Sequence, residues 1–437
     1  MPSRRELLAL AALLGLPSGV RARPEPVLEW TSPVELARGA GVRGPWQQNE
    51  SRYDFVDDPA LALRDDGSMV AAWVDQRRKA VRVQRLRPDG GADGPPLEVA
   101  GEAEAFSWIP RLAIVPGAPD TVLLLWQEII FSGGSHGGDM LLARSTDGGR
   151  TFSNASNLSS SVGGDGKGRI TPEVWHNGSY DLLALPGGRV FVAWTEYDGP
   201  LWVARSTDAG RTFGRPRRVD TGSPRPARAP SLAFAGGALL LAWTEGDQPA
   251  ADIRIARSAD GERFEASTVM PTPGYSDAPR MALDGRGIVH LAWGEASGGP
   301  FSAQRVLYTR SRDAGRHFDA PRAVGGALPA GAVSAGFPSL AVDGRGTVVL
   351  LAELQDDVRQ RPRGIGIMTS HDGGENFGPM ALVPHSRDPG GGFNGSSQGL
   401  LLPKLALNAR GDLVVANSAL REGSHSRVWL VRGRLPT

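Results

Sequence analysis

Cysteine is absent from this sequence of 437 residues. Its absence excludes disulfide bonds, thiolate metal sites and an N-terminal cysteine that could carry a lipid anchor. A surplus of charge of one sign is also absent, because 48 lysines and arginines are balanced by 47 aspartates and glutamates. No broad electrostatic field therefore attracts nucleic acid or an anionic membrane, and we expect no nucleic-acid partner.

Apolar runs long enough to cross a membrane are missing as well. The run Leu7 to Leu16 is shorter than the about 18 residues that a spanning helix needs. Paired arginines in Ser3 to Leu8 precede this run, and the small residues of Val20 to Ala22 follow it, an order that resembles a twin-arginine export signal. We therefore expect a signal peptide over residues 1–22, no integral membrane segment, and a mature protein that is periplasmic or secreted. An amphipathic N-terminal helix is the alternative.

Glycine and proline, at 58 and 34 residues, are plentiful, as in an all-β chain with many turns. One such turn recurs: ARSTDGGRTF at residues 143–152 returns as ARSTDAGRTF at 204–213. Three further copies, ARSADGERF, TRSRDAGRHF and TSHDGGENF, begin at residues 256, 309 and 369. In each copy we expect the aspartate to bind backbone amides, a glycine to take a positive φ, and the phenylalanine to be buried under the sheet.

A longer repeat surrounds each turn. Upstream of the turns, second strands end in tryptophan and an acid: residues 71–75, 124–128, 192–196, 241–245 and 291–295. Before them come first strands that begin near a proline: Pro59, Pro110, Pro230, Pro279, Pro338 and Pro403. Each unit is a four-stranded antiparallel meander of roughly fifty to sixty residues, the size of a propeller blade.

Seven units can be counted, and the last one lacks a strand. The final unit, Lys404 to Arg434, ends after its third strand, whereas Trp30 to Leu36 has the rhythm of a fourth strand. Pairing of Trp30 to Leu36 with Val428 to Val431 would close the ring and leave no open edge. We therefore expect an all-β fold, a single seven-bladed β-propeller over residues 27–437; the count becomes six if the first or last unit is only a cap.

The five turns resemble the Asp-box, or BNR, repeat of the sialidase superfamily, and the similarity extends from Trp30 to Leu435. This resemblance implies a propeller with the Asp-boxes on the face opposite the functional site. It does not fix an activity, because one fold serves many functions. Long glycine-rich connections at 159–179 and 384–402 place the expected binding surface on the opposite, loop-rich face.

The sialidase resemblance also implies a set of catalytic residues. In that family three arginines clamp a carboxylate, a tyrosine assisted by a glutamate is the nucleophile, and an aspartate is the acid/base. Here Arg228 stands in a segment similar to the RIP motif, and Tyr275 with Asp277 in a segment similar to the one carrying the nucleophile, while Arg111 and Arg280 are further clamp candidates. The order of these motifs along the units differs from the family pattern, and simple pairing of each arginine with an acid is the alternative.

The acids that end the second strands form another candidate set. Equivalent positions in six units would arrange them as a ring near one mouth, where they could bind a ligand or a hard cation such as Ca²⁺, or pair with basic residues of neighbouring first strands. The pairing interpretation is favoured, and we expect no metal site and no cofactor. The ring consists of Asp75, Glu128, Glu196, Glu245, Glu295 and Glu353, and the ligand-binding candidates are Glu128, Glu196, Glu245, Glu295 and Lys404.

The sequence thus favours an exported propeller that binds a carbohydrate or protein ligand through its loop-rich face. The alternative is an exo-α-sialidase-type glycoside hydrolase acting on an anionic terminal sugar. A metal- or cofactor-binding propeller is the third hypothesis; scattered loop histidines, among them His136, His176, His385 and His425, lack metal-binding spacing. Clustering of Tyr275 with a carboxylate and three arginines would favour the hydrolase.

Overall fold

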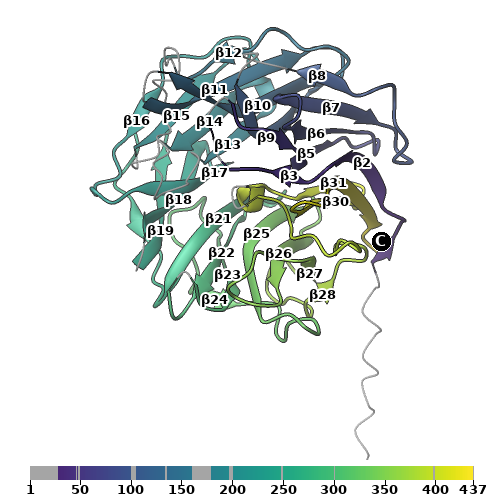
Figure 1. Cartoon of the computed structure of the whole chain (residues 1–437). Helices are drawn as coiled ribbons and strands as arrows, with labels where there is room; N and C mark the ends of the chain where they lie inside the picture. Colours follow the sequence, from purple (N-terminus) through teal and green to yellow (C-terminus); the bar gives the residue numbers. More distant parts are fainter. Residues whose placement is uncertain are drawn as a thin grey trace, which may run out of the picture.

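Seven four-stranded antiparallel sheets surround a central axis in a computed structural model (Figure 1), and first strands of neighbouring sheets contact one another. The structure describes residues 28–436, except 46, 48–49, 100–104, 133–134, 160–178, 196–199, 248–249, 300 and 397–398. The first three blades consist of β5 (Val56–Leu63), β6 (Met69–Asp75), β7 (Ala80–Leu86) and β8 (Leu97–Val99); of β9 (Phe106–Val115), β10 (Ala118–Ser132), β11 (Ser135–Ser145) and β12 (Ser156–Asn157); and of β13 (Tyr180–Ala184), β14 (Val190–Thr195), β15 (Leu201–Ser206) and β16 (Arg217–Val219). The fourth, fifth and sixth consist of β17 (Ala227–Ala235), β18 (Ala238–Asp247), β19 (Ala250–Ser258) and β20 (Thr268–Val269); of β21 (Tyr275–Leu283), β22 (Val289–Ala296), β23 (Gln304–Ser311) and β24 (Arg322–Ala323); and of β25 (Ser334–Val342), β26 (Val348–Gln355), β27 (Ile365–Ser370) and β28 (Ala381–Leu382). The seventh consists of β29 (Leu405–Leu407), β30 (Asp412–Arg421) and β31 (His425–Arg434) together with β1 (Glu29–Trp30) and β2 (Val34–Gly39). A ribbon of β3 (Val42–Arg43) and β4 (Tyr53–Asp54) and two 3-10 turns, η1 (Pro186–Gly188) and η2 (Gly399–Leu401), complete the described elements. The predicted seven-bladed fold is confirmed.

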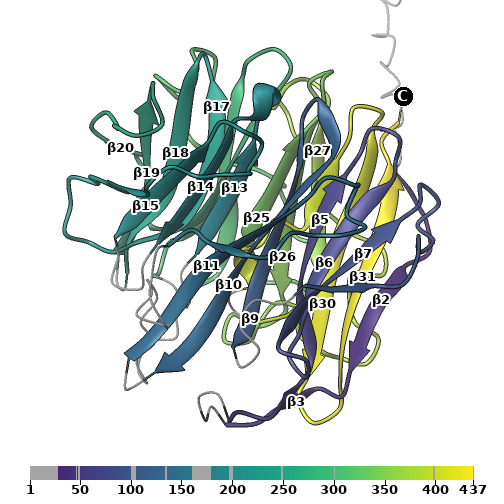
Figure 2. The ribbon, with the colours of Figure 1, turned by 90° about the horizontal axis from the view of Figure 1, so that it is seen from above.

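The ring is closed by the two ends of the described chain (Figure 2), where β2 and β31 lie side by side. β31 pairs with β30 on one side and with β1 and β2 on the other. Val34 lies opposite Leu430, as predicted, but Trp30 lies further along β31, opposite Gly433, because residues 31–33 interrupt the pairing. Leu36 of β2 packs between the last blade and the first, so this strand joins two blades as well as completing one.

Tryptophans of the second strands fill the spaces between blades. Trp126, Trp194, Trp243 and Trp293 are at most 1% exposed, and each packs with apolar side chains of the preceding blade. Trp243 of β18, for example, contributes to a cluster with Phe191 and Val203 of the blade before it. A large planar side chain at this position buries much apolar surface between two stacked sheets, which explains its recurrence along the sequence.

The repeated turns join third strands to fourth strands and contain the hydrogen bonds expected from their sequence. In the first copy Asp147 Oδ1 accepts from Ser145 Oγ at 2.8 Å and from Thr151 N at 2.9 Å, while Gly149 has a φ of 91°. The phenylalanines pack against the blade clusters, as expected, but their side chains are partly and not completely buried. We call the face that carries these turns the turn face.

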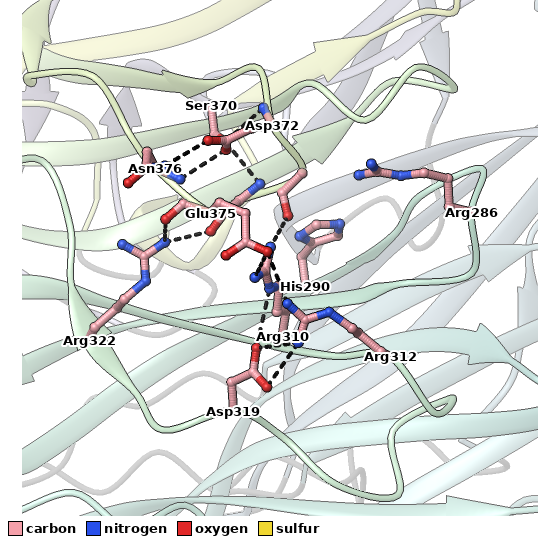
Figure 3. A network of polar contacts seen from close by, with 12 residues as sticks. Arg286, His290, Arg310, Arg312, Asp319, Arg322, Ser370, Asp372, Glu375 and Asn376 are labelled. Atoms are coloured by element: carbon pink, nitrogen blue, oxygen red, sulfur yellow. Dashed lines mark hydrogen bonds and ion pairs between the residues drawn. The ribbon is translucent and has the colours of Figure 1, made fainter.

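Arginines of the third strands tie neighbouring turns together on this face. Between the fifth and sixth blades, Arg310 contacts Asp319 and Glu375 and donates at 2.7 Å to the carbonyl of Gly373 (Figure 3). Arg144 and Arg205 reach the carbonyls of Ala209 and Asp260 in the next blade in the same way. The turns are therefore structural contacts between blades.

His290 of β22 lies beneath this network with a fully buried side chain. Its Nδ1 is 2.6 Å from the Tyr308 hydroxyl and its Nε2 is 3.6 Å from a carboxylate oxygen of Asp284. Burial outweighs the attraction of Asp284 and lowers the pKa of His290 from its ordinary value of 6.5 to about 4. The folded protein therefore holds this imidazole neutral.

His290 should make the fold sensitive to acid. His290 binds a proton below pH 6.5 in the unfolded chain but only below about pH 4 in the folded protein. Above pH 6.5 it therefore does not affect the unfolding free energy, whereas between pH 6.5 and pH 4 protonation of the unfolded chain lowers the unfolding free energy by about 3 kcal/mol. We expect His290→Gln to show a smaller loss of unfolding free energy than wild type between pH 7 and pH 4.5, measured by urea denaturation. Identical losses in both proteins would contradict the assignment.

Candidate functional site

Five first strands are kinked near their N-terminal ends, which lie beside the propeller axis on the loop-rich face. The residue before a proline has a positive φ in each, and the strand pairing shifts register there. A positive φ in a residue with a side chain is strained, and such strain is concentrated at functional sites. These five prolines lie inside the strands. The expectation that such prolines begin the first strands was wrong at these positions. The kinked residues are Asp58, Ile109, Ala229, Ala278 and Phe337, with φ from 47° to 55°.

Two of the predicted clamp arginines meet at the axis. Arg111 and Arg280 are 5% and 6% exposed, and both donate to the same backbone carbonyl, that of Leu401, with 3.2 Å from Arg111 Nη2. Arg111 also donates to the carbonyl of Tyr180, at 2.9 Å from Nη2. Arg111 Nη1 and Arg280 Nε are buried without a hydrogen-bond partner among the described residues. A cavity of about 10 Å³ lies beside them, room for about one water molecule.

The electrostatics of this pair favour a bound anion. Burial lowers the pKa of Arg111, and burial followed by repulsion from Arg111 lowers the pKa of Arg280 to about 9. The charge of Asp181 opposes both pKa shifts and that of Asp277 opposes the shift of Arg280, without cancelling them. Two buried cations that share one neutral acceptor are short of negative charge, and a carboxylate would supply it.

The other three catalytic candidates form a second, adjoining group on β17 and β21. Arg228 Nε lies 3.1 Å from Asp277 Oδ1, and its Nη2 donates to the Tyr275 hydroxyl. Asp277 also accepts from Thr244 Oγ1 at 3.1 Å. The structure thus brings Arg228, Tyr275 and Asp277 together, and the charge of Asp277 offsets part of the lowering of the Arg280 pKa.

The acids of the second strands are held by local contacts. Glu128 accepts from Trp126 Nε1 at 3.0 Å, Glu295 from Gly274 N at 2.8 Å, and Glu245 contacts Arg254. Asp75 lies 3.4 Å from Arg78, whereas Glu196 falls outside the described residues. Within the described ranges no three His, Asp or Glu side chains are grouped so that they could hold a metal ion. A ligand-binding role of these acids stays a prediction.

Lys404 belongs to a buried polar network just before the first strand of the last blade. Its Nζ lies 2.6 Å from Glu353 Oε1 and 2.9 Å from Asn417 Oδ1. Asn394, from the long connection at 384–402, donates to Glu353 at 2.6 Å. Lys404 and Glu353, each 3% exposed, form a buried ion pair across two blades, the kind of pairing expected for the second-strand acids. A ligand contact of Lys404 stays a prediction.

A pair of buried carboxyl groups at the start of the first blade was not predicted from the sequence. Asp57 and Asp58 are 1% and 0% exposed; Asp58 Oδ1 accepts from Ser396 Oγ at 2.9 Å, and Asp57 Oδ1 from Ser418 Oγ at 2.6 Å. Burial, then the charge of Asp57, raises the pKa of Asp58 to about 8, so that its carboxyl is protonated at neutral pH. Alignment of the units on their prolines would have indicated these residues, since Asp57 stands two residues before its proline, as Arg228 and Asp277 do.

Comparisons with known proteins show the fold alone. The sequence matches no protein-family model and no curated protein. A PL25 ulvan lyase bound to -[GlcA(1-4)Rha3S]- aligns with a TM-score of 0.53 and 14% identity over 86% of this chain and 94% of that one. A Penicillium chrysogenum alpha-L-arabinanase complexed with arabinobiose has a TM-score of 0.50 and 16% identity over 74% and 92%. A Fusarium graminearum alpha-L-arabinofuranosidase with an iminosugar inhibitor has a TM-score of 0.50 and 14% identity over 92% and 98%.

The chain is therefore a propeller with the architecture of these carbohydrate-active enzymes. No helix in its described part is long and apolar enough to cross a membrane. The predicted signal peptide lies outside the described residues.

The Lys404–Glu353 pair allows a direct test of its structural role. Glu353→Gln leaves the Lys404 ammonium buried without its counter-charge, and we expect the unfolding free energy to fall by about 3 kcal/mol. Glu98→Gln is the matched control, because Glu98 pairs with Arg82 at 2.9 Å but is 43% exposed; its cost should be below about 1 kcal/mol. Equal costs in urea denaturation would show that the buried pair contributes no more than the surface pair.

Proposed function

We propose that this protein binds an acidic saccharide at the loop-rich end of the propeller axis, with a carboxylate held between Arg111 and Arg280. The observation that carries the proposal is the sharing of one neutral carbonyl by two buried guanidinium groups, two of whose nitrogens find no partner among the described residues. Guanidinium groups match carboxylates in shape and charge, and burial strengthens such hydrogen bonds.

The fold neighbours support a saccharide as the class of ligand. All three act on or bind sugars by their names, and the saccharide bound to the ulvan lyase contains GlcA, which carries a carboxylate. A uronic acid would supply the negative charge that the axial arginines lack. Export through the predicted signal peptide, which we retain as part of the proposal, would bring the protein into contact with extracellular polysaccharides.

Binding of glucuronate tests the proposal. We expect isothermal titration calorimetry to detect binding of D-glucuronate and none of D-glucose, and Arg111→Met to raise the Kd at least about 10-fold because a charge-assisted hydrogen bond is lost. Arg359→Met is the control, since its side chain is 84% exposed on the surface, and should leave the Kd unchanged. Equal Kd values for Arg111→Met and wild type would overturn the assignment.

A second candidate function is hydrolysis of an anionic terminal sugar by a sialidase-type mechanism. It is favoured by the contact of Arg228 with both Tyr275 and Asp277, next to the axial arginines. In that mechanism Tyr275 would be the nucleophile, Asp277 the acid/base, and Arg228 a third clamp residue. The reaction would then pass through a covalent glycosyl–enzyme intermediate and retain the configuration at the anomeric carbon.

A fluorogenic sialoside distinguishes hydrolysis from binding alone. If the protein is a hydrolase, Tyr275→Phe should lower kcat at least about 100-fold, because the attacking oxygen is removed, while KM changes little. Tyr308→Phe is the control, as this hydroxyl contacts His290 beneath the turn face. Absence of turnover in wild type would reject the hydrolase and leave the binding proposal standing.

A further inference from the structure

A short segment of the connection between the sixth and seventh blades occupies the axial position. It consists of η2, Gly399–Leu401, and we call it the axial plug. The plug carbonyl at Leu401 accepts from both axial arginines, and the hydroxyl of the nearby Ser396 donates to Asp58. The plug therefore lies against both the axial arginines, through Leu401, and the buried carboxyl group of Asp58, through Gly399.

The plug fits its seat closely. Leu400 is 6% exposed, and the plug is held by hydrogen bonds from Gly399 N to Ser396 Oγ at 3.0 Å and from Leu402 N to the Gly399 carbonyl at 3.1 Å. A Cβ atom at Gly399 would lie 2.3 Å from Asp58 Oδ1, so only glycine can approach the carboxyl group this closely. The remaining cavity of about 10 Å³ is too small for any sugar.

The plug is nevertheless a poor chemical partner for the groups that it covers. A peptide carbonyl carries no charge, and it leaves Arg111 Nη1 and Arg280 Nε unpaired among the described residues. A carboxylate has two oxygens and a full charge, and so can accept from both guanidinium groups at once. Exchange of the carbonyl for a carboxylate is therefore favourable at the arginines, which are already removed from water.

We propose that the axial plug is an internal substitute for the ligand, which a uronic acid displaces by placing its carboxylate between Arg111 and Arg280 and a neighbouring hydroxyl on Asp58. This inference rests on the proposed function. It adds Asp58 to the binding residues and makes the affinity depend on release of the plug. Because Asp58 is protonated at neutral pH, it donates a hydrogen bond to the sugar hydroxyl without repelling the carboxylate.

The energetic consequence is a binding constant set by two steps. If the plug leaves its seat only a small fraction of the time, the apparent Kd is the intrinsic Kd divided by that fraction. A change that loosens the plug without touching the arginines should therefore tighten binding. Loss of an arginine should weaken binding whether or not the plug is seated.

The absence of cysteine allows displacement of the plug to be observed directly. Leu400→Cys introduces the only thiol of the chain at a buried position, and we expect saturating D-glucuronate to increase its rate of modification by a thiol reagent at least about 10-fold. D-Glucose should leave the rate unchanged. Ser424→Cys, at an exposed turn, is the control that should react at the same rate with and without glucuronate. Glucuronate binding detected by calorimetry without a change in the Leu400→Cys rate would overturn the plug and leave the proposed function intact.

Gly399→Ala provides a second, independent measurement. The added Cβ clashes with Asp58 and should push the plug from its seat, lowering the Kd for glucuronate several-fold. Gly344→Ala is the matched control, because a Cβ there meets no atom within 4 Å, and its Kd should equal that of wild type. Binding that is weakened by Gly399→Ala would show that the plug supports the ligand and would overturn the inference. Absence of glucuronate binding in wild type and Gly399→Ala alike would contradict both the plug and the proposed function.

Discussion

The antiparallel pairing of β2 with β31 is the constraint on which the rest of the structure depends. A propeller has no central element, so each blade is held by its two neighbours, and an unpaired outer strand would expose a β edge and the apolar surface beneath it. The N-terminal strand pairs with the C-terminal one and places Leu36 between the last blade and the first. With the ring closed, first strands from seven blades converge, and side chains separated by up to several hundred residues meet at the axis.

Where the first strands converge, several features lower the stability of the folded state. Buried cations without full counter-charge, a protonated aspartate and five strained residues before proline are all found within the kinked ends of the first strands. Each raises the free energy of the folded state, and repacking with apolar side chains would relieve it. The turn face has the opposite character, because its arginines meet carboxylates and turn carbonyls. This contrast between the two faces agrees with a functional site on the loop-rich side.

The repetitive part of the structure could be predicted from the sequence, and the non-repetitive part could not. Residues equivalent to Trp243 and Asp147 recur at fixed positions in several units. This periodicity was enough to place the tryptophans in strands and the aspartates in turns, and to count seven blades. Arg111 and Arg280 were identified as clamp residues by type and position, but their shared acceptor belongs to an aperiodic connection whose path depends on tertiary contacts. Pairing of a second-strand acid with a basic residue of the neighbouring first strand was expected from the repeat, but the particular partners of Lys404, Glu353 and Asn417, could not be identified because they lie in other strands and follow no fixed spacing. Asp57 and Asp58 do follow a sequence pattern, because they stand directly before the repeated proline. That proline had been interpreted only as the beginning of a strand.

The tryptophans of the second strands have one more consequence. Each comes from one blade and completes the core of the blade before it, so the hydrophobic unit of this protein is a junction between two repeats, while the repeat in the sequence is a single blade. Duplication of one unit during evolution would therefore have supplied both a tryptophan and the sheet that receives one, and any number of copies could stack in sequence. Curvature and the pairing of the chain ends, and not the complementarity of the junctions, would then determine where the stacking stops.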